Sequence, residues 1–317
     1  MATFTLGLSA LSGSSTTETP LIRAIENRSD TGEVGPQADQ ARVIRAQILL
    51  DRARFSPGQI DGRYGDDLVI AIKGYEEAHQ MKSDGIIGAQ MWGALNADKR
   101  ALLTKYTITA ADLKGPFAPI PADVREQARM KWMGYESPTE GLAEKFHLST
   151  RLLAELNPGK NLEKAGTVIV VPAVTRGPTR RAVRVVVSKS RRTVTAYGAG
   201  DKLIAQYPAT LGGPHDPLPI GNWKITTVQR NPWFNYDPVH FWNASPKDAA
   251  AKLPPGPKNP AGVVWMGLSK EHYGIHGTPD PERVRRGESY GCIRLTNWDA
   301  ADLSHMVVRG TPAILEE

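Results

Sequence analysis

The chain contains a single cysteine, Cys292, among its 317 residues. One thiol cannot close an intramolecular disulfide. It is also a poor start for a metal site, which usually gathers several Cys or His side chains at short spacing. No disulfide framework or cysteine cluster therefore constrains the fold, and Cys292 is either an inert buried thiol or a nucleophile.

The residues around Cys292 favour the nucleophile. Cys292 lies in the string SYGCIRL, and His276 lies upstream in YGIHGTP. A thiol attacks as the thiolate, and its unperturbed pKa of about 8.5 leaves little thiolate at neutral pH. A nearby imidazole can accept the proton, and Gly291 beside the sulfur leaves room for a substrate carbonyl. We predict a catalytic pair of Cys292 and His276.

The composition is that of a globular protein, with 40% hydrophobic and 23% charged residues. No run of eighteen apolar residues is present, so no transmembrane segment is expected. The segment Thr3 to Ser12 is mildly apolar, but no Lys or Arg precedes it. It is not a proper signal peptide, and an export signal is either absent or truncated in this sequence.

The net charge of +6 is unevenly distributed. Residues 180–317 hold 18 basic and 12 acidic residues, whereas residues 1–179 hold 21 of each. The basic residues are scattered and lack interleaved aromatics, which argues against nucleic acid as a partner. A polymer rich in carboxylates would be attracted equally well.

The first part of the chain predicts a flexible leader over 1–37 and a small helical domain over 38–98. Apolar spacing indicates helices at 41–51, at 68–79 and through Trp92, separated by turns at Asp61-Gly62 and Asp84-Gly85. With the strings PGQIDGRYG and SDGIIGAQMWGAL, this stretch resembles the peptidoglycan-binding domain of bacterial cell-wall enzymes. The resemblance implies binding to the wall. A helical spacer without that capacity is the alternative.

A proline-rich linker is predicted over 99–130, followed by a βααβ unit over 131–174. Its expected elements are a strand at 132–135, helices at 142–146 and 149–156, and a strand at 167–171. The strings LAEKFHLS, LLAELNP and GTVIVVP make it resemble LysM, a module that binds N-acetylglucosamine polymers. A packing role without glycan binding stays open.

The C-terminal part, residues 180–317, is predicted to be mostly antiparallel β-structure. Short β-branched runs at 183–187, 193–197 and 203–207 are followed by further strands at 223–228 and 262–268, with no long helical period between them. The strings YPATLGGPHDPLPIGNWKI and YGIHGTPDPERVRRGESYGCIRL resemble the L,D-transpeptidase catalytic domain of the YkuD type. The predicted fold class is therefore multidomain α+β, with a mainly antiparallel β-sandwich as the catalytic domain.

The family resemblance implies roles for individual residues. Cys292 would form a thioester, His276 would activate the thiol, and the carbonyl of Gly277 would orient the imidazole. Arg294 would hold a substrate carboxylate or support its loop. The resemblance also implies that Ser289, Tyr290 and Gly291 form the oxyanion loop. Tyr273 and Trp265 would line the substrate pocket.

A metal is not expected. His272 lies four residues before His276, but the intervening Tyr-Gly-Ile favours a strand, and the family uses neither a metal nor another cofactor. His272 is expected at the surface or the pocket rim. In NlpC/P60-like and papain-like peptidases the Cys precedes its His, whereas here His276 precedes Cys292, which favours the transpeptidase.

The resemblance implies a periplasmic or envelope enzyme that makes 3→3 peptidoglycan cross-links and reacts with carbapenems. Its partners would be stem peptides and glycan strands. With water as acceptor it would be an L,D-carboxypeptidase or cross-link hydrolase, and with a protein amine it would attach an envelope protein to the wall. A wall-binding protein without catalysis is disfavoured by the intact Cys292 and His276 pair.

Overall fold

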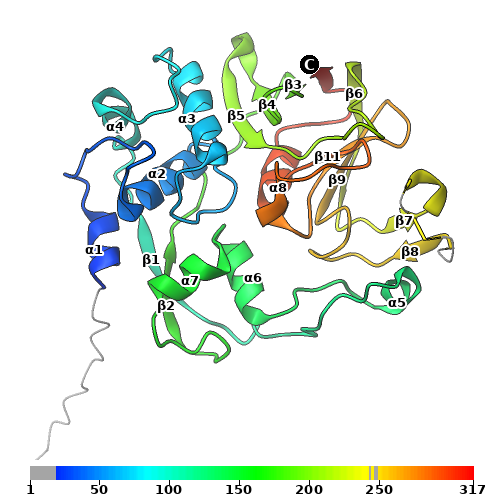
Figure 1. The fold of residues 1–317 in the computed structure, drawn as a ribbon, viewed down its shortest axis with the longest axis horizontal. Coiled ribbons are helices and arrows are strands. Elements are labelled where there is room, and N and C mark those ends of the chain that lie inside the picture. Colours follow the sequence, from blue (N-terminus) through cyan, green and yellow to red (C-terminus); the bar gives the residue numbers. More distant parts are fainter. Residues whose placement is uncertain (1–18, 243, 246–248) are drawn as a thin grey trace, which may run out of the picture.

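The fold is taken from a computed structural model that describes residues 19–317 except 243 and 246–248 (Figure 1). Four helices gather at the N-terminal side, and a β-rich part holds the C-terminal half. Among the described residues, none of the helices is long and apolar enough to cross a membrane.

The helical domain contains α2 (Gln40–Arg52), α3 (Asp66–Ala78) and α4 (Ala89–Leu95), close to the three helices predicted. The leader prediction is wrong for the described residues before 38. Pro20–Glu26 forms α1, which the Thr19 side chain caps. Ile22 and Ile25 of α1 are buried in the core. Their burial stabilises this helix within a segment whose polar composition had indicated flexibility. Residues 1–18 lie outside the described part.

The next unit is built around an antiparallel pair of β1 (Leu103–Thr107) and β2 (Val168–Pro172). Helices α6 (Pro138–Lys145) and α7 (Thr150–Leu156) lie between these strands in the sequence. The first strand therefore falls inside the segment expected to be a linker. The predicted strand at 132–135 is wrong.

Residues 132–135 do not pair with β2 because Met133 bonds elsewhere. Its N–H donates to the carbonyl of Pro255 at 2.9 Å, and its carbonyl accepts from the N–H of Lys258 at 3.0 Å. In Figure 1 the segment after β1 runs beneath the C-terminal half, forms α5 (Val124–Arg129) near β8 (Ala251–Leu253), and returns to α6. This excursion attaches the middle of the chain to the C-terminal half.

The two front units share one hydrophobic core. Ile44 and Leu50 of α2 belong to the same buried cluster as Leu152 of α7 and Ile169 of β2. The turn at Ile60 bonds to the loop between α6 and α7, with the N–H of Ile60 donating to His147 O at 2.7 Å. The front units are thus fused into one body.

The C-terminal half forms one hydrogen-bonded sheet in the order β11-β10-β9-β6-β12-β3-β4-β5. Its outer part contains β3 (Arg184–Ser188), β4 (Thr193–Tyr197) and β5 (Leu203–Pro208), close to the predicted positions. The pairs β12–β3 and β10–β11 are parallel, and the other neighbours are antiparallel.

The two parts of the sheet are joined by β6 (Gly221–Arg230), which pairs with strands of both. Its first residues pair with β12 (Pro312–Glu316), and the residues from Ile225 onward pair with β9 (Val264–Leu268). The register shifts between Ile225 and Thr227, which re-aims the strand. A single core that includes Leu303 of α8 (Asn297–Ser304) packs against both parts. A small hairpin of β7 (Phe234–Tyr236) and β8 stands apart from this sheet.

The front body is docked onto the C-terminal half through main-chain bonds. Ser56 N donates to Gln206 O at 2.9 Å, and the side-chain amide of Gln206 donates to Ile70 O of α3 at 2.8 Å. Gly74 allows α3 to lie close to β5, since a Cβ at this position would lie 2.3 Å from the amide nitrogen of Gln206. The edge strand β5 is covered by this contact.

A buried ionic cluster completes the junction. Arg176, in the connection between β2 and β3, contacts Asp51 at 2.7 Å, Asp299 at 2.8 Å and Asp302 at 3.0 Å. His147 contacts the same Asp51 at 3.0 Å and stacks on Trp298. One guanidinium therefore joins α2 of the front body to α8 of the C-terminal half.

Candidate active site

Two short strands position the predicted nucleophile and base. In the parallel pair β10 (Gly274–His276) and β11 (Ile293–Arg294), His276 lies opposite Arg294. Cys292 directly precedes β11. Residues two apart on a strand share a face, so Cys292 and Arg294 lie on the face that carries His276. The spacer from Gly277 to Gly291 leaves the sheet and returns beside its starting point.

The imidazole of His276 is buried and held in one orientation. Its Nδ1 lies 2.7 Å from the carbonyl oxygen of Gly277, the contact expected from the sequence. The bond assigns the proton to Nδ1 and leaves Nε2 as an acceptor. Trp265 stacks on the ring with centroids 5.2 Å apart. Burial, and then the charge of Arg294, lower the pKa of His276 to about 3, so the ring is neutral at physiological pH.

The thiol of Cys292 is in its protonated form at rest. Burial raises its pKa above the ordinary value, while the N–H of Gly274 and the charge of Arg294 act in the opposite direction with smaller effect. Its Sγ lies 3.6 Å from the carbonyl oxygen of His272. The site therefore combines a neutral thiol with a neutral imidazole, and attack requires a proton transfer between them.

The loop before Cys292 is shaped by one glycine and one serine. Gly291 has φ of +88°, and a Cβ there would lie 2.6 Å from the ring of Tyr273. Ser289 donates from its hydroxyl to the carbonyl of Cys292, and its N–H donates to Leu211 O at 2.9 Å. These contacts fix the peptide groups on both sides of the nucleophile.

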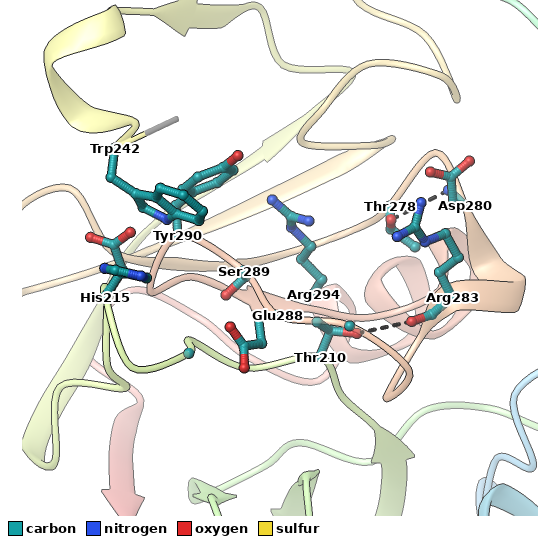
Figure 2. Close-up of a pocket in the computed structure, with 13 residues that line it drawn as sticks. Thr210, His215, Trp242, Thr278, Asp280, Arg283, Glu288, Ser289, Tyr290 and Arg294 are labelled. Carbon is teal, nitrogen blue, oxygen red and sulfur yellow. Dashed lines mark hydrogen bonds between the residues drawn. The ribbon is translucent and has the colours of Figure 1, made fainter. Parts of the chain in front are cut away.

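A cavity of about 340 Å³ lies beside this loop. Figure 2 shows His215, Trp242 and Tyr290 at one end, Thr278, Asp280 and Arg283 at the other, and Arg294 between them. Cys292 and His276 are not among the lining residues, but Tyr290 and Arg294, each two positions from Cys292, are.

Arg294 presents a positive charge to the cavity, and one carboxylate that acts on this charge is Asp280 of the same cavity. Its Nε is buried and has no hydrogen-bond partner, and within the described residues no carboxylate forms an ion pair with its guanidinium. Its main chain exchanges two hydrogen bonds with Thr210, each 2.9 Å long. The backbone is thus held by the sheet while the side chain stays available to a ligand.

Two residues expected in the pocket lie beside His276 and Cys292 and are not among those that line this cavity. Trp265 does not line the cavity, because it stacks on His276 and fills the space beside Gly274. Tyr273 packs against Gly291 instead. His272 is exposed and forms no metal site; its ring contacts that of His240, with centroids 4.7 Å apart. No metal-binding group of His, Cys, Asp or Glu occurs in the part of the chain that the structure describes.

Sequence reasoning missed several residues of the cavity. His215 stacks on Trp242 with centroids 4.5 Å apart, and Asp280 and Arg283 form the opposite end. Their only sequence signal was proximity to Pro-rich turns, which says nothing about which cavity a side chain faces.

The comparisons with known proteins agree with this geometry. The family model described as the L,D-transpeptidase catalytic domain (YkuD) matches residues 182–315. A putative L,D-transpeptidase YkuD of Bacillus licheniformis is 32% identical over 174 residues, covering 54% of this chain and 89% of that protein. The chain belongs to the L,D-transpeptidase family. Its Cys292, His276 and Gly277 lie within the matched region.

Other relatives of this L,D-transpeptidase are similar over the same half. The putative L,D-transpeptidase YkuD of Bacillus subtilis is 30% identical over 171 residues, covering 54% of this chain and 88% of that protein. A second model, described as a putative peptidoglycan binding domain, matches residues 39–95, the region of α2 to α4. A solved L,D-transpeptidase from Mycobacterium smegmatis aligns at 18% identity and a TM-score of 0.35, over 50% of this chain and 76% of that one. A score that low adds no argument.

Proposed function

We propose that the protein is a cell-envelope L,D-transpeptidase that forms 3→3 cross-links between peptidoglycan stem peptides. The observation that supports this proposal is the placement of Cys292 directly before β11, which pairs with the strand of the buried His276, whose imidazole is oriented by Gly277. The acyl donor would be a tetrapeptide stem. An imidazole whose Nδ1–H is held by the Gly277 carbonyl presents Nε2 as the acceptor for the thiol proton.

The reaction has two half-steps. In the first, Sγ of Cys292 attacks the carbonyl that precedes the terminal D-Ala while Nε2 of His276 takes the thiol proton. The C–N bond breaks, the proton goes to the leaving D-Ala amine, and a thioester remains. In the second, an acceptor amine attacks the thioester, His276 takes its proton, the C–S bond breaks and the thiol is restored.

The developing oxyanion needs hydrogen-bond donors, and the peptide N–H groups of Tyr290 to Cys292 are the nearest candidates. Gly291 brings this main chain close to the reacting carbon, since it carries no Cβ. Arg294 would bind a carboxylate of the donor stem. Its buried Nε, which has no hydrogen-bond partner, favours this role over a purely supporting one.

The front body would hold the enzyme on the wall. The match of residues 39–95 to a peptidoglycan-binding model supports this role for α2 to α4. The pairing of β1 with β2 around α6 and α7 supports a LysM-like module whose first strand lies at 103–107. Glycan binding by that module is part of the proposal.

The test is covalent trapping. The protein is incubated with a carbapenem and weighed, and we expect one adduct on the wild type and none on Cys292→Ala. A folded wild type that gains no mass would overturn the acyl-enzyme. Product analysis with purified tetrapeptides then separates cross-linking from carboxypeptidase activity, in which water is the acceptor, and from transfer to a protein amine.

Wall attachment is tested separately with the intact chain. The Cys292→Ala form is mixed with purified sacculi and recovered by centrifugation, with and without soluble N-acetylglucosamine oligomers. Retention that the oligomers weaken supports glycan binding by the LysM-like module. Undiminished retention removes that module from the proposal and leaves the helical domain as the anchor.

A further inference from the structure

A second cavity, of about 460 Å³, lies where the front body meets the C-terminal half. Three separate parts of the chain contribute to its walls: the turn after α2, the helices α6 and α7, and two loops of the catalytic half. Representative lining residues from these parts are Arg63, Glu136, Glu140, Lys258, Glu282 and Arg286. No single domain could form this cavity alone.

The second cavity adjoins the catalytic one. Asp280 lines both, and the segment that follows it, through Arg286, separates them. Asp280 lies at the right of Figure 2, at one end of the catalytic cavity. A ligand in the second cavity would therefore meet the catalytic cavity at Asp280 without occupying it.

The wall between the cavities is braced by the front body. Lys258 contacts Glu140 of α6 at 2.9 Å, the carbonyl of Pro279 at 3.1 Å and Asp280 at 3.7 Å. Arg285 forms an ion pair of 2.8 Å with Asp67 of α3. This bracing gives the cavity a fixed shape before any ligand arrives.

The rim of the second cavity carries both signs of charge. Arg63 and Arg286 are exposed, and neither guanidinium forms an ion pair within the described residues. Glu136 and Glu282 stand exposed on the same rim. Such a rim complements a ligand that carries both an ammonium group and carboxylates, because the glutamates attract the first and the arginines attract the second.

A transpeptidase must bind two peptides, and the second must deliver a primary amine to the thioester. We propose that the junction cavity binds the acceptor, a peptide with a free side-chain amine and several carboxylates. Asp280 would guide the amine toward Cys292, and Arg63 and Arg286 would hold carboxylates of the same peptide. This inference rests on the proposed function and adds a substrate site that the front body helps to form.

The test compares the two half-reactions in the full chain. In the double variant Arg63→Ala/Arg286→Ala, the carbapenem acylation rate and donor-dependent D-Ala release should match the wild type. The KM for an acceptor tripeptide should rise about 5- to 10-fold, as expected for two exposed charge contacts. At saturating acceptor, cross-link formation should recover. Arg309→Ala, an exposed arginine outside both cavities, is the control and should change nothing.

The outcomes distinguish this inference from the proposed function. An unchanged acceptor KM in the double variant overturns the acceptor site while leaving the enzyme a transpeptidase. D-Ala release without any cross-link in the wild type overturns it as well. A wild type that is never acylated refutes the proposed function itself. Arg286→Glu should raise the acceptor KM further than Arg286→Ala. A graded effect of charge would show that the higher KM does not come from a local rearrangement.

Discussion

The carboxylate of Glu144 on α6 accepts a hydrogen bond of 2.9 Å from the side-chain amide of Asn297, the first residue of α8. The oxygen of the same Asn297 accepts from the N–H of Val263 at 3.0 Å. That oxygen also lies against Gly277, where a Cβ would meet it at 2.1 Å. A front-body carboxylate thus supports the main chain that orients His276.

We expect Glu144→Gln to make the protein more stable at pH 8 and to change little at pH 4. Burial raises the pKa of Glu144 to about 7, above its unfolded value of about 4.5. The folded state then binds more protons between these values, so stability falls as pH rises through this window. Removing the ionisable group should recover about 1–3 kcal/mol at pH 8.

Urea denaturation at both pH values measures this effect. Gln keeps an oxygen for Asn297, whereas Glu144→Ala removes the acceptor and should lower both stability and kcat. Equal unfolding free energies for wild type and Glu144→Gln at pH 8 would contradict the view that the ionised, buried carboxylate of Glu144 destabilises the folded state.

We expect the carbapenem acylation rate of the wild type to be flat between pH 5 and 8. The pKa of His276 lies near 3, and that of Cys292 is raised, so neither group changes protonation in this range. In His276→Ala only the thiolate can attack. The rate should fall about 10²- to 10⁴-fold at pH 7 and then rise tenfold per pH unit.

Stopped-flow measurement of acylation against pH checks this profile. His272→Asn, which keeps a residue tolerant of the positive φ at this exposed position, is the matched control and should retain the plateau. An inflection near pH 6.5 in the wild type would mean that the imidazole titrates normally and is not buried as described.

Gly291→Ala should lower the acylation rate about 10²-fold, because the methyl group would collide with Tyr273 at a φ of +88°. Gly287→Ala in the same loop is the control. A Cβ there has no atom within 4 Å, so its rate should stay within a factor of two or so of the wild type. Similar rates for both variants would rule out a strict requirement for glycine beside Cys292. Carbapenem adduct formation followed by mass spectrometry provides the rates.

Arg176→Ala should destabilise the protein by about 3–5 kcal/mol, because it leaves the buried carboxylates of Asp51 and Asp299 without their cation. Arg191→Ala breaks an exposed ion pair with Glu77 across the same junction and should cost less than about 1 kcal/mol. The shift in the urea midpoint measures both. If the two variants unfolded alike, the buried cluster would have no special role in joining the halves.

The sequence predicts Cys292 and His276 as a catalytic pair because both lie in short strings with characteristic neighbours. The strands of the catalytic half followed from their β-branched runs. Other features left no local trace. The polar face of α6 is typical of a solvent-exposed helix surface. It therefore did not predict the hydrogen bond between Glu144 and Asn297, which are 153 residues apart in the sequence. The strand at 103–107 was missed because its partner was sought at Trp132, where Met133 binds the opposite half instead.

The linker predicted over 99–130 suggested that the front units could move relative to the catalytic half. Their shared core and the ion pairs of Arg176 hold them in one arrangement instead. A catalytic domain on a flexible linker can reach any position within the length of that linker. If α2 to α4 bind the wall as proposed, the distance from these helices to Cys292 is fixed by packing. Only strands that lie at that one separation and angle would come within reach, so the geometry of the wall itself would select which neighbours are joined.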